Sequence, residues 1–180
     1  MAKRIIIHAG FHKTGTTALQ RSFAAARAEL LKHDVSYPGD WWRSHHKQVW
    51  SLRNRAWGWS SRGATRLPIS HWKTLVRDTR NQRQTTLLSS EFFAQLPLDK
   101  IQRIKNDFAG QPVEIVFTIR PMVSLLPSIY QQYLKFGLRE DYESWLHHMF
   151  DAPGESKITP TFWKRHPQSA VIEKWAEVFG

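Results

Sequence analysis

The stretch RIIIHAGFHKTGTTALQ, residues 4–20, decides the fold of this 180-residue chain. It begins with a short β-branched run, Arg4–Ala9, which is typical of a buried strand. A loop at Gly10–Gly15 follows, and Thr16 or Thr17 then opens a helix that runs toward Lys32. One face of that helix is apolar, because it carries Leu19, Phe23, Ala26 and Leu30. A strand, a glycine-containing turn and an amphipathic helix in this order predict an α/β unit.

Further strands and helices alternate along the chain. We predict strands at 35–37, 85–89 and 113–119, and we expect the last of these to be buried because it reads Val-Glu-Ile-Val-Phe-Thr-Ile. Helices are predicted at 46–53, 69–80, 98–108, 142–150 and 170–179. Another is predicted from Ser124, as its cap, to Phe136, with Pro127 in its first turn. This alternation predicts an α/β three-layer sandwich with a mainly parallel sheet, as one domain over residues 1–180. In such sheets ligands bind at the carboxyl ends of the strands.

Composition restricts the chemistry and the partners. The chain has no Cys, which excludes disulfides, thiolate metal sites and cysteine nucleophiles. No apolar run approaches the length of a membrane span or of a signal sequence, so we expect a soluble, cytoplasmic protein.

The formal net charge of +11 is concentrated in residues 41–83, the basic Trp-rich segment, which has eight Arg and two Lys against one acid, Asp78. It also holds six of the nine Trp. Such a segment favours an anionic partner: nucleic acid, a phosphorylated cofactor or an acidic glycan. The alternative interpretation is a solvated basic surface with the Trp residues packed beneath it.

The loop between the first strand and the first helix has the composition of an anion site. It reads Gly10-Phe11-His12-Lys13-Thr14-Gly15-Thr16-Thr17. Two glycines allow a tight turn, the helix N-terminus offers N–H groups, and Lys13, Thr16 and Thr17 add a charge and two hydroxyls. A nucleotide-hydrolysing P-loop has Lys directly after its second Gly, followed by a magnesium-binding Ser or Thr. Here Thr16 occupies the Lys position, which disfavours a metal-assisted ATPase or kinase.

The motif His12-Lys13-Thr14-Gly15-Thr16-Thr17 resembles the 5′-phosphosulfate-binding loop of the sulfotransferase superfamily, and especially its bacterial members. The resemblance implies a P-loop-like nucleotide-binding topology. It also implies that the co-substrate is 3′-phosphoadenosine 5′-phosphosulfate, bound by His12, Lys13, Thr14, Gly15, Thr16 and Thr17 without a metal. Lys13 would stabilise the charge that develops on the leaving phosphate.

A second motif joins Arg120-Pro121 to Ser128, eight residues after the Arg. A guanidinium at a strand end and a hydroxyl on the next helix suit a phosphate, although such a pair is common in proteins. Sulfotransferases carry a similar Arg and Ser at this spacing. The resemblance therefore assigns Arg120 and Ser128 to the 3′-phosphate of the cofactor.

Three residues are candidates for the base that takes the proton from the acceptor. Glu91 follows the strand that ends at Ser89, and a desolvated carboxylate there would have a raised pKa. The other interpretation is that Glu91 caps a following helix. His45 and His46 are the rival bases, since imidazole titrates near neutral pH. The pair His147-His148 is interpreted as a solvated helix face.

These observations favour a sulfotransferase that acts on a hydroxyl or amine of a carbohydrate or small molecule, which can itself be acidic. We expect the basic Trp-rich segment to form much of the acceptor pocket. The alternatives are a P-loop nucleotide kinase and a basic nucleic-acid-binding module, of which nucleic acid is the less favoured partner. The resemblance also implies a further strand and an Arg- and Gly-containing loop, which the chain, ending at Gly180, lacks. We therefore interpret it as a truncated or short form.

Overall fold

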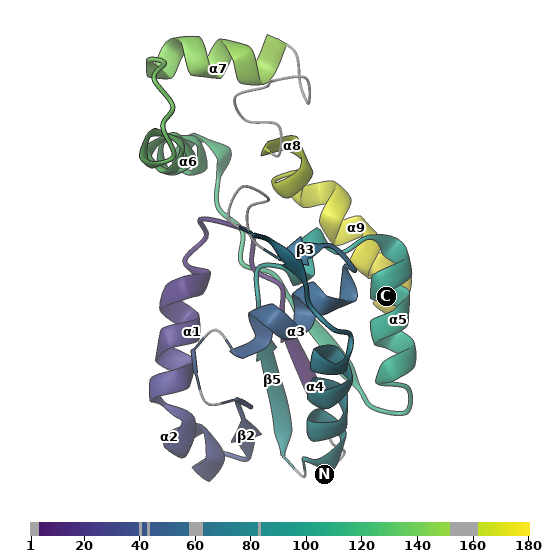
Figure 1. The fold of residues 1–180 in the computed structure, drawn as a ribbon. Coiled ribbons are helices and arrows are strands. Elements are labelled where there is room, and N and C mark those ends of the chain that lie inside the picture. Colours follow the sequence, from purple (N-terminus) through teal and green to yellow (C-terminus); the bar gives the residue numbers. More distant parts are fainter. Residues whose placement is uncertain (1–3, 40, 43, 58–62, 83, 152–161) are drawn as a thin grey trace.

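The protein is described by a computed structural model that covers residues 4–180 except 40, 43, 58–62, 83 and 152–161. Its centre is a four-stranded sheet in the order β2-β5-β1-β6 (Figure 1). The strands are β1 (Ile5–His8), β2 (Val35–Ser36), β5 (Thr85–Ser89) and β6 (Val113–Val116). All three pairings are parallel, with Ile5 aligned with both Thr86 and Val113. The fold is therefore α/β with a parallel central sheet, as the alternation predicts.

Helices flank this sheet, an arrangement that is compatible with a three-layer sandwich (Figure 1). The helices are α1 (Thr16–Ala25), α2 (Arg27–Lys32), α3 (Ser44–Leu52), α4 (Ser70–Asn81), α5 (Leu98–Asp107), α6 (Met122–Lys135), α7 (Tyr142–Asp151), α8 (Phe162–Arg165) and α9 (Gln168–Phe179). A 3-10 turn, η2 (Phe93–Gln95), and the antiparallel pair β3 (Ala56–Trp57) and β4 (Thr65–Arg66) complete the described elements. None of the helices in the described ranges has both the length and the apolarity needed to cross a membrane.

The hydrophobic side chains form two clusters. The larger cluster joins β1 to α3, α4, α5 and α9, with Ile7, Trp72 and Trp175 among its fully buried members. The smaller one is built by α6, α7 and α8 around Trp145. In Figure 1 these three helices stand beyond the end of the sheet that is opposite the N-terminus. That end is the carboxyl end of the strands, so the smaller cluster lies above the region where a ligand is expected.

The prediction of a buried strand at 113–119 is wrong in two respects. The strand ends at Val116, and in the described sheet it is an edge strand beside β1. Its side chains alternate: Val113 and Ile115 pack on the larger cluster, whereas Glu114 is exposed and pairs with Arg4 at 3.1 Å. An apolar run alone does not distinguish a central strand from an edge strand. The charged Glu114 between Val113 and Ile115, however, indicates a strand with one buried and one exposed face.

Two helix predictions also need correction. The helix expected from Thr16 to Lys32 is interrupted at Ala26, and its fully buried side chains are the polar Thr16 and Gln20. The expected apolar face is only half-buried. Helix α6 starts at Met122, so Ser124 is not its cap and Pro127 lies in its second turn. The other predicted helices, and the strand at 85–89, are confirmed to within about two residues at each end.

Candidate functional site

Close packing at Gly10 positions the loop after β1. A Cβ atom on Gly10 would lie closer than 3.0 Å to the Thr16 methyl, the Thr118 hydroxyl and His8 Nε2, so no larger residue fits without displacing them. Two backbone bonds join the end of β1 and the loop to β6 and the chain just after it, from Ala9 N to Val116 O at 2.9 Å and from Phe11 N to Thr118 O at 3.2 Å. The loop is thus anchored to the sheet edge that the sequence predicts for a ligand.

A chain of buried hydrogen bonds supports the loop from below. Ser89 Oγ lies 2.7 Å from His8 Nδ1, and His8 Nε2 lies 3.1 Å from Thr118 Oγ1. Thr118 Oγ1 is 3.0 Å from Thr14 Oγ1, which donates to the Phe11 carbonyl at 2.7 Å. Burial lowers the pKa of His8 despite the opposing charge of Glu91. If the neutral His8 accepts a hydrogen bond at Nδ1 and donates one at Nε2, each hydroxyl group in the series donates once. The hydrogen bonds then all run in the same direction, from Ser89 through His8, Thr118 and Thr14 to the Phe11 carbonyl.

The loop backbone adopts two left-handed conformations, at Lys13 (φ 66°) and Gly15 (φ 89°). Such a conformation is unfavourable for Lys by about 1–2 kcal/mol. Arg120 helps to hold it, since its guanidinium donates to the Lys13 carbonyl at 3.2 Å. Gly15 caps α1 without a side-chain hydrogen bond, which leaves the first N–H groups of this ten-residue helix directed toward the loop.

A pocket of about 590 Å³ opens at this loop and helix start. Most residues of the predicted motif line it, together with residues from β5's end and from α6. The lining consists of His12, Lys13, Gly15, Thr16, Thr17, Ala18, Arg21, Glu91, Ser128 and Gln132. Three segments that the sequence marks separately, at 10–17, at Glu91 and at Ser128, therefore meet in one cavity.

Thr14 and Arg120 have supporting positions instead. The Thr14 hydroxyl turns inward to Phe11 and Thr118, as described above. The Arg120 side chain donates from Nε to Ser124 Oγ at 3.1 Å, one helical turn before Ser128, and from its terminal nitrogen to Lys13. Neither side chain belongs to the pocket lining, so the structure connects Arg120 to the loop more directly than to Ser128.

Glu91 and His46 form a largely buried pair at the pocket wall. His46 Nε2 lies 3.0 Å from Glu91 Oε2, and the side chains are 6% and 16% exposed. Gln20 from α1 donates to the same oxygen at 3.3 Å. Burial raises the pKa of Glu91, but the hydrogen bond and charge of His46 outweigh it and lower the pKa to about 2. The expectation of a raised pKa is therefore wrong: the side chain is a carboxylate at neutral pH.

His45 and His12 are neutral at pH 7, because burial lowers the pKa of each to about 4. Both ring nitrogens of His45 are engaged with backbone: Nδ1 accepts from Ser89 N at 3.0 Å, and Nε2 donates to Pro38 O at 3.0 Å. No nitrogen of His45 remains to accept a proton from a ligand. His12 differs, since it lines the pocket and contacts Gln95, whose carbonyl accepts from Arg53 at 2.6 Å. His147 and His148 lie on an exposed helix face, as predicted.

The basic Trp-rich segment divides between the core and the site. Trp72 is fully buried in the larger cluster, which is the packing alternative for this residue. Trp50 and Trp57 instead meet Phe92 with ring centroids 4.9 and 5.4 Å away, and Phe92 also contacts the rings of His46 and His12. This aromatic group adjoins the Glu91 side of the pocket. Residues 58–62 of this segment lie outside the described residues.

Some pocket residues have no counterpart in the sequence prediction. Arg21 and Gln132 line the cavity, and Gln20 bonds Glu91 from beneath. Arg21 lies four and five residues after Thr17 and Thr16 on the same helix, so the helical repeat was a usable signal for it. Among the described residues, no group of three His, Asp or Glu side chains has the placement of a metal site.

The chain matches no protein-family model, no curated protein and no solved structure. Its function is therefore inferred from the chemistry of the pocket.

Proposed function

We propose that this protein is a sulfotransferase that uses 3′-phosphoadenosine 5′-phosphosulfate as sulfuryl donor and has a P-loop-like topology. The observation that carries the proposal is the single pocket that joins the Lys13 loop, the start of α1, Ser128 and Glu91. The sequence patterns at these positions independently indicate parts of a nucleotide or acceptor site.

The residues present fit a phosphorylated nucleotide. A volume of about 590 Å³ lies within the range of small-ligand pockets. The left-handed Lys13 and Gly15 and the start of α1 line the cavity, and backbone N–H groups at helix starts and in left-handed turns bind anions. Lys13 and Arg21 add two cations, and Thr16, Thr17 and Ser128 add hydroxyl donors. This donor set suits a multiply charged ligand.

When bound, the co-substrate supplies an activated sulfuryl group. Lys13 and the N–H groups at the start of α1 then stabilise the negative charge that grows on the leaving phosphate oxygens. Arg120 keeps the Lys13 backbone in place through its bond to the carbonyl oxygen. Ser128 donates a hydrogen bond to a distal phosphate, and Arg120 reaches that phosphate only by giving up its bond to Ser124.

Glu91 receives the proton of the acceptor hydroxyl. A carboxylate whose pKa is about 2 is a weak base, so it takes the proton late, when the acceptor oxygen has become acidic through bonding to sulfur. A loose transition state tolerates such late transfer. His46 orients the carboxylate and stabilises its charge through the Nε2 bond. His45 supports β5 through Ser89.

The test is calorimetry with 3′-phosphoadenosine 5′-phosphate, the desulfated product, in the absence of magnesium. We expect it to bind more tightly than adenosine 5′-phosphate, because the pocket has partners for both phosphates. Ser128→Ala should weaken binding of the bisphosphate and leave adenosine 5′-phosphate unchanged, with Ser144→Ala on α7 as the control. Equal affinity for the two nucleotides, or no binding of either, would refute the proposal.

A further inference from the structure

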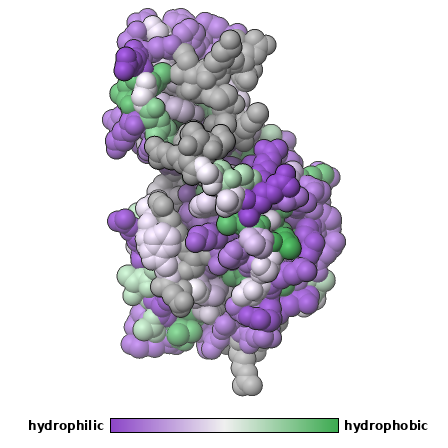
Figure 2. Space-filling view, in the orientation of Figure 1, coloured by the Kyte–Doolittle hydropathy of each residue, from purple (hydrophilic) through white to green (hydrophobic). Residues whose placement is uncertain are grey.

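A second hollow lies between α4 and α5, and it belongs to no part of the pocket described above. It has a volume of about 290 Å³ and is lined by Trp72, Lys73, Val76, Arg77, Arg80, Asn81, Arg103 and Asp107. The lining thus includes four cationic side chains and one carboxylate. Figure 2 shows that the molecular face over this region is mostly hydrophilic.

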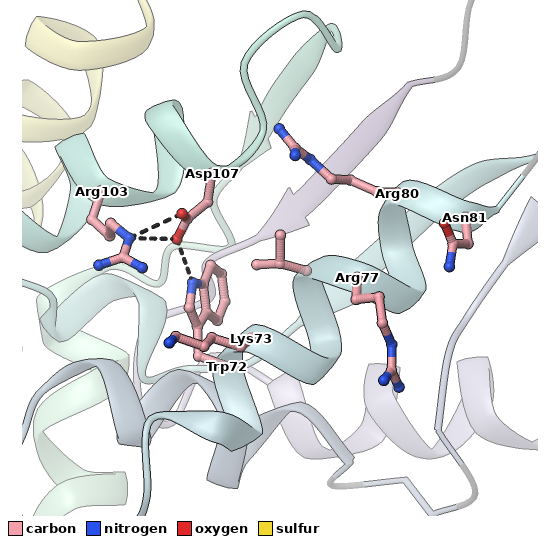
Figure 3. A pocket seen from close by; sticks show the side chains of 8 residues that line it. Trp72, Lys73, Arg77, Arg80, Asn81, Arg103 and Asp107 are labelled. Atoms are coloured by element: carbon pink, nitrogen blue, oxygen red, sulfur yellow. Dashed lines mark hydrogen bonds and ion pairs between the residues drawn. The ribbon is translucent and has the colours of Figure 1, made fainter.

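The single carboxylate of this α4–α5 groove is already neutralised. Arg103 Nε donates to both oxygens of Asp107, at 2.9 and 2.8 Å, and Trp72 Nε1 donates to one of them at 2.7 Å (Figure 3). The terminal nitrogens of Arg103 point away from Asp107 in Figure 3. Within the described part of the chain, these nitrogens and the Lys73 ammonium have no hydrogen-bond or ion-pair partner. The groove therefore has donors to offer to an anion.

The cationic side chains of the groove are spread along helix α4 and do not converge on one position. Lys73 and Arg80 are seven residues apart on α4, about 10 Å along the helix axis. Figure 3 shows Arg80 reaching to the α5 side of α4, whereas Arg77 reaches away from α5 and pairs with Asp78 at 3.0 Å. Because α4 leads directly into the amino end of β5, its Lys73 end is nearer the carboxyl end of the sheet, where the candidate site lies.

The groove suits an acidic carbohydrate better than nucleic acid. Single-stranded nucleic acids bind on exposed aromatic faces, and the one aromatic side chain of the groove, Trp72, is fully buried. A duplex is bound through many phosphates over a longer surface than four cations provide. A hollow of about 290 Å³ fits a sugar unit with one or two anionic substituents.

We propose that the α4–α5 groove binds sulfate or carboxylate groups of an acidic polysaccharide, and that Lys73, Arg80 and Arg103 are its main contacts. This inference rests on the proposed sulfotransferase activity in one respect: it assigns the acceptor to the acidic polysaccharides, whose chain extends from the Glu91 side of the pocket along α4. Anion binding in the groove is a property of its own residues.

The experiment measures the affinity of the whole chain for size-defined dextran sulfate by calorimetry at two salt concentrations. The variant is Lys73→Gln/Arg80→Gln, and the control is Lys135→Gln/Arg139→Gln, which removes two exposed charges near the α6–α7 turn. We expect the groove variant to bind at least tenfold more weakly with a smaller salt dependence, and the control to change by less than twofold. Lys73→Glu, which leaves Arg80 and its contacts intact, should weaken binding in the same direction if the double variant is unstable.

Three results would overturn the proposal. The first is that dextran sulfate does not bind the unmodified chain, and the second is that the groove and control variants lose affinity equally. The third is that oligo-thymidine of matched charge binds as tightly as dextran sulfate and loses the same affinity in the groove variant. Neutral dextran should not bind. The nucleotide affinity of the groove variant should equal that of the unmodified chain. A failure of nucleotide binding alone would therefore refute the sulfotransferase and leave the anion groove standing.

Discussion

Replacement of Glu91 by Gln tests the buried pair on which the proposed chemistry depends. Gln has the shape of a protonated Glu, so the variant reports what the charge contributes. Its environment lowers the pKa of Glu91 from 4.5 to about 2, and each pKa unit corresponds to about 1.4 kcal/mol. The folded state therefore favours the carboxylate over the neutral acid by about 3 kcal/mol. We expect Glu91→Gln to lower the free energy of unfolding by up to this amount at pH 7.

The pH dependence gives the sign of the effect. A carboxyl group whose pKa is lowered on folding contributes full stability above its unfolded pKa, near 4.5, and loses it as the pH falls toward 2. The difference in unfolding free energy between the unmodified chain and Glu91→Gln should therefore be constant above about pH 5 and shrink below it. Urea denaturation followed by tryptophan fluorescence measures it. Glu143→Gln, at an exposed position of α7, is the control and should stay within about 0.5 kcal/mol.

A double-mutant cycle with His46→Gln identifies the partner. If the 3.0 Å bond between His46 and Glu91 causes the lowered pKa, the two substitutions should couple by about 1–3 kcal/mol. Affinity for the bisphosphate nucleotide should change little, while sulfuryl transfer should largely disappear. A coupling below about 0.5 kcal/mol, or a loss of stability below about 1 kcal/mol in Glu91→Gln, would refute this account of the pair.

Three further predictions concern the loop and its support. Gly10→Ala should destabilise the fold by about 1–3 kcal/mol in urea because its Cβ overlaps three neighbours, and a loss below about 0.5 kcal/mol would contradict this packing. Between pH 6.5 and 4 the buried His45 is protonated only in the unfolded chain, so the free energy of unfolding should fall as the pH falls. His45→Gln should reduce the slope of this fall by about 1.4 kcal/mol per pH unit, and an unchanged slope would show that His45 is solvated. Lys13→Ala should lower the rate of sulfuryl transfer more than it weakens binding of the product nucleotide, and equal effects would remove its role at the leaving group.

The sequence predicted the features that depend on neighbouring residues in the chain. The strand at 85–89 has Leu87 and Leu88 beside the β-branched Thr85 and Thr86, and the loop at Gly10–Gly15 has its own turn chemistry. The position of Glu91 near the ligand follows from one rule: in a parallel sheet, ligands bind at the carboxyl ends of the strands, and Glu91 comes just after the end of β5. Each of these inferences needed only local pattern and the direction of the strands.

The features that were missed depend on partners from elsewhere in the chain. The pKa of Glu91 is set by His46, which α3 brings from 45 residues earlier, so burial alone predicted the wrong direction. Gln20 lies outside the predicted apolar face of its helix, yet it is fully buried and donates to Glu91. The exposed outer position of β6 follows from strand order, which the apolar run did not contain.

The support beneath the loop explains why these distant contacts bear on binding. The hydrogen-bonded series starts at Ser89 in β5 and passes to His8 in β1. It continues to Thr118, just after β6, and ends at Thr14 in the loop, with each side chain donating to the next. A protonated His8 would reverse its bond with Ser89, and burial favours the neutral ring because it lowers the pKa of His8. A loop held by three segments of the sheet keeps its N–H groups and Lys13 in place before any ligand arrives. Stabilisation of a developing charge then requires little reorganisation, which is the condition under which such donors are most effective.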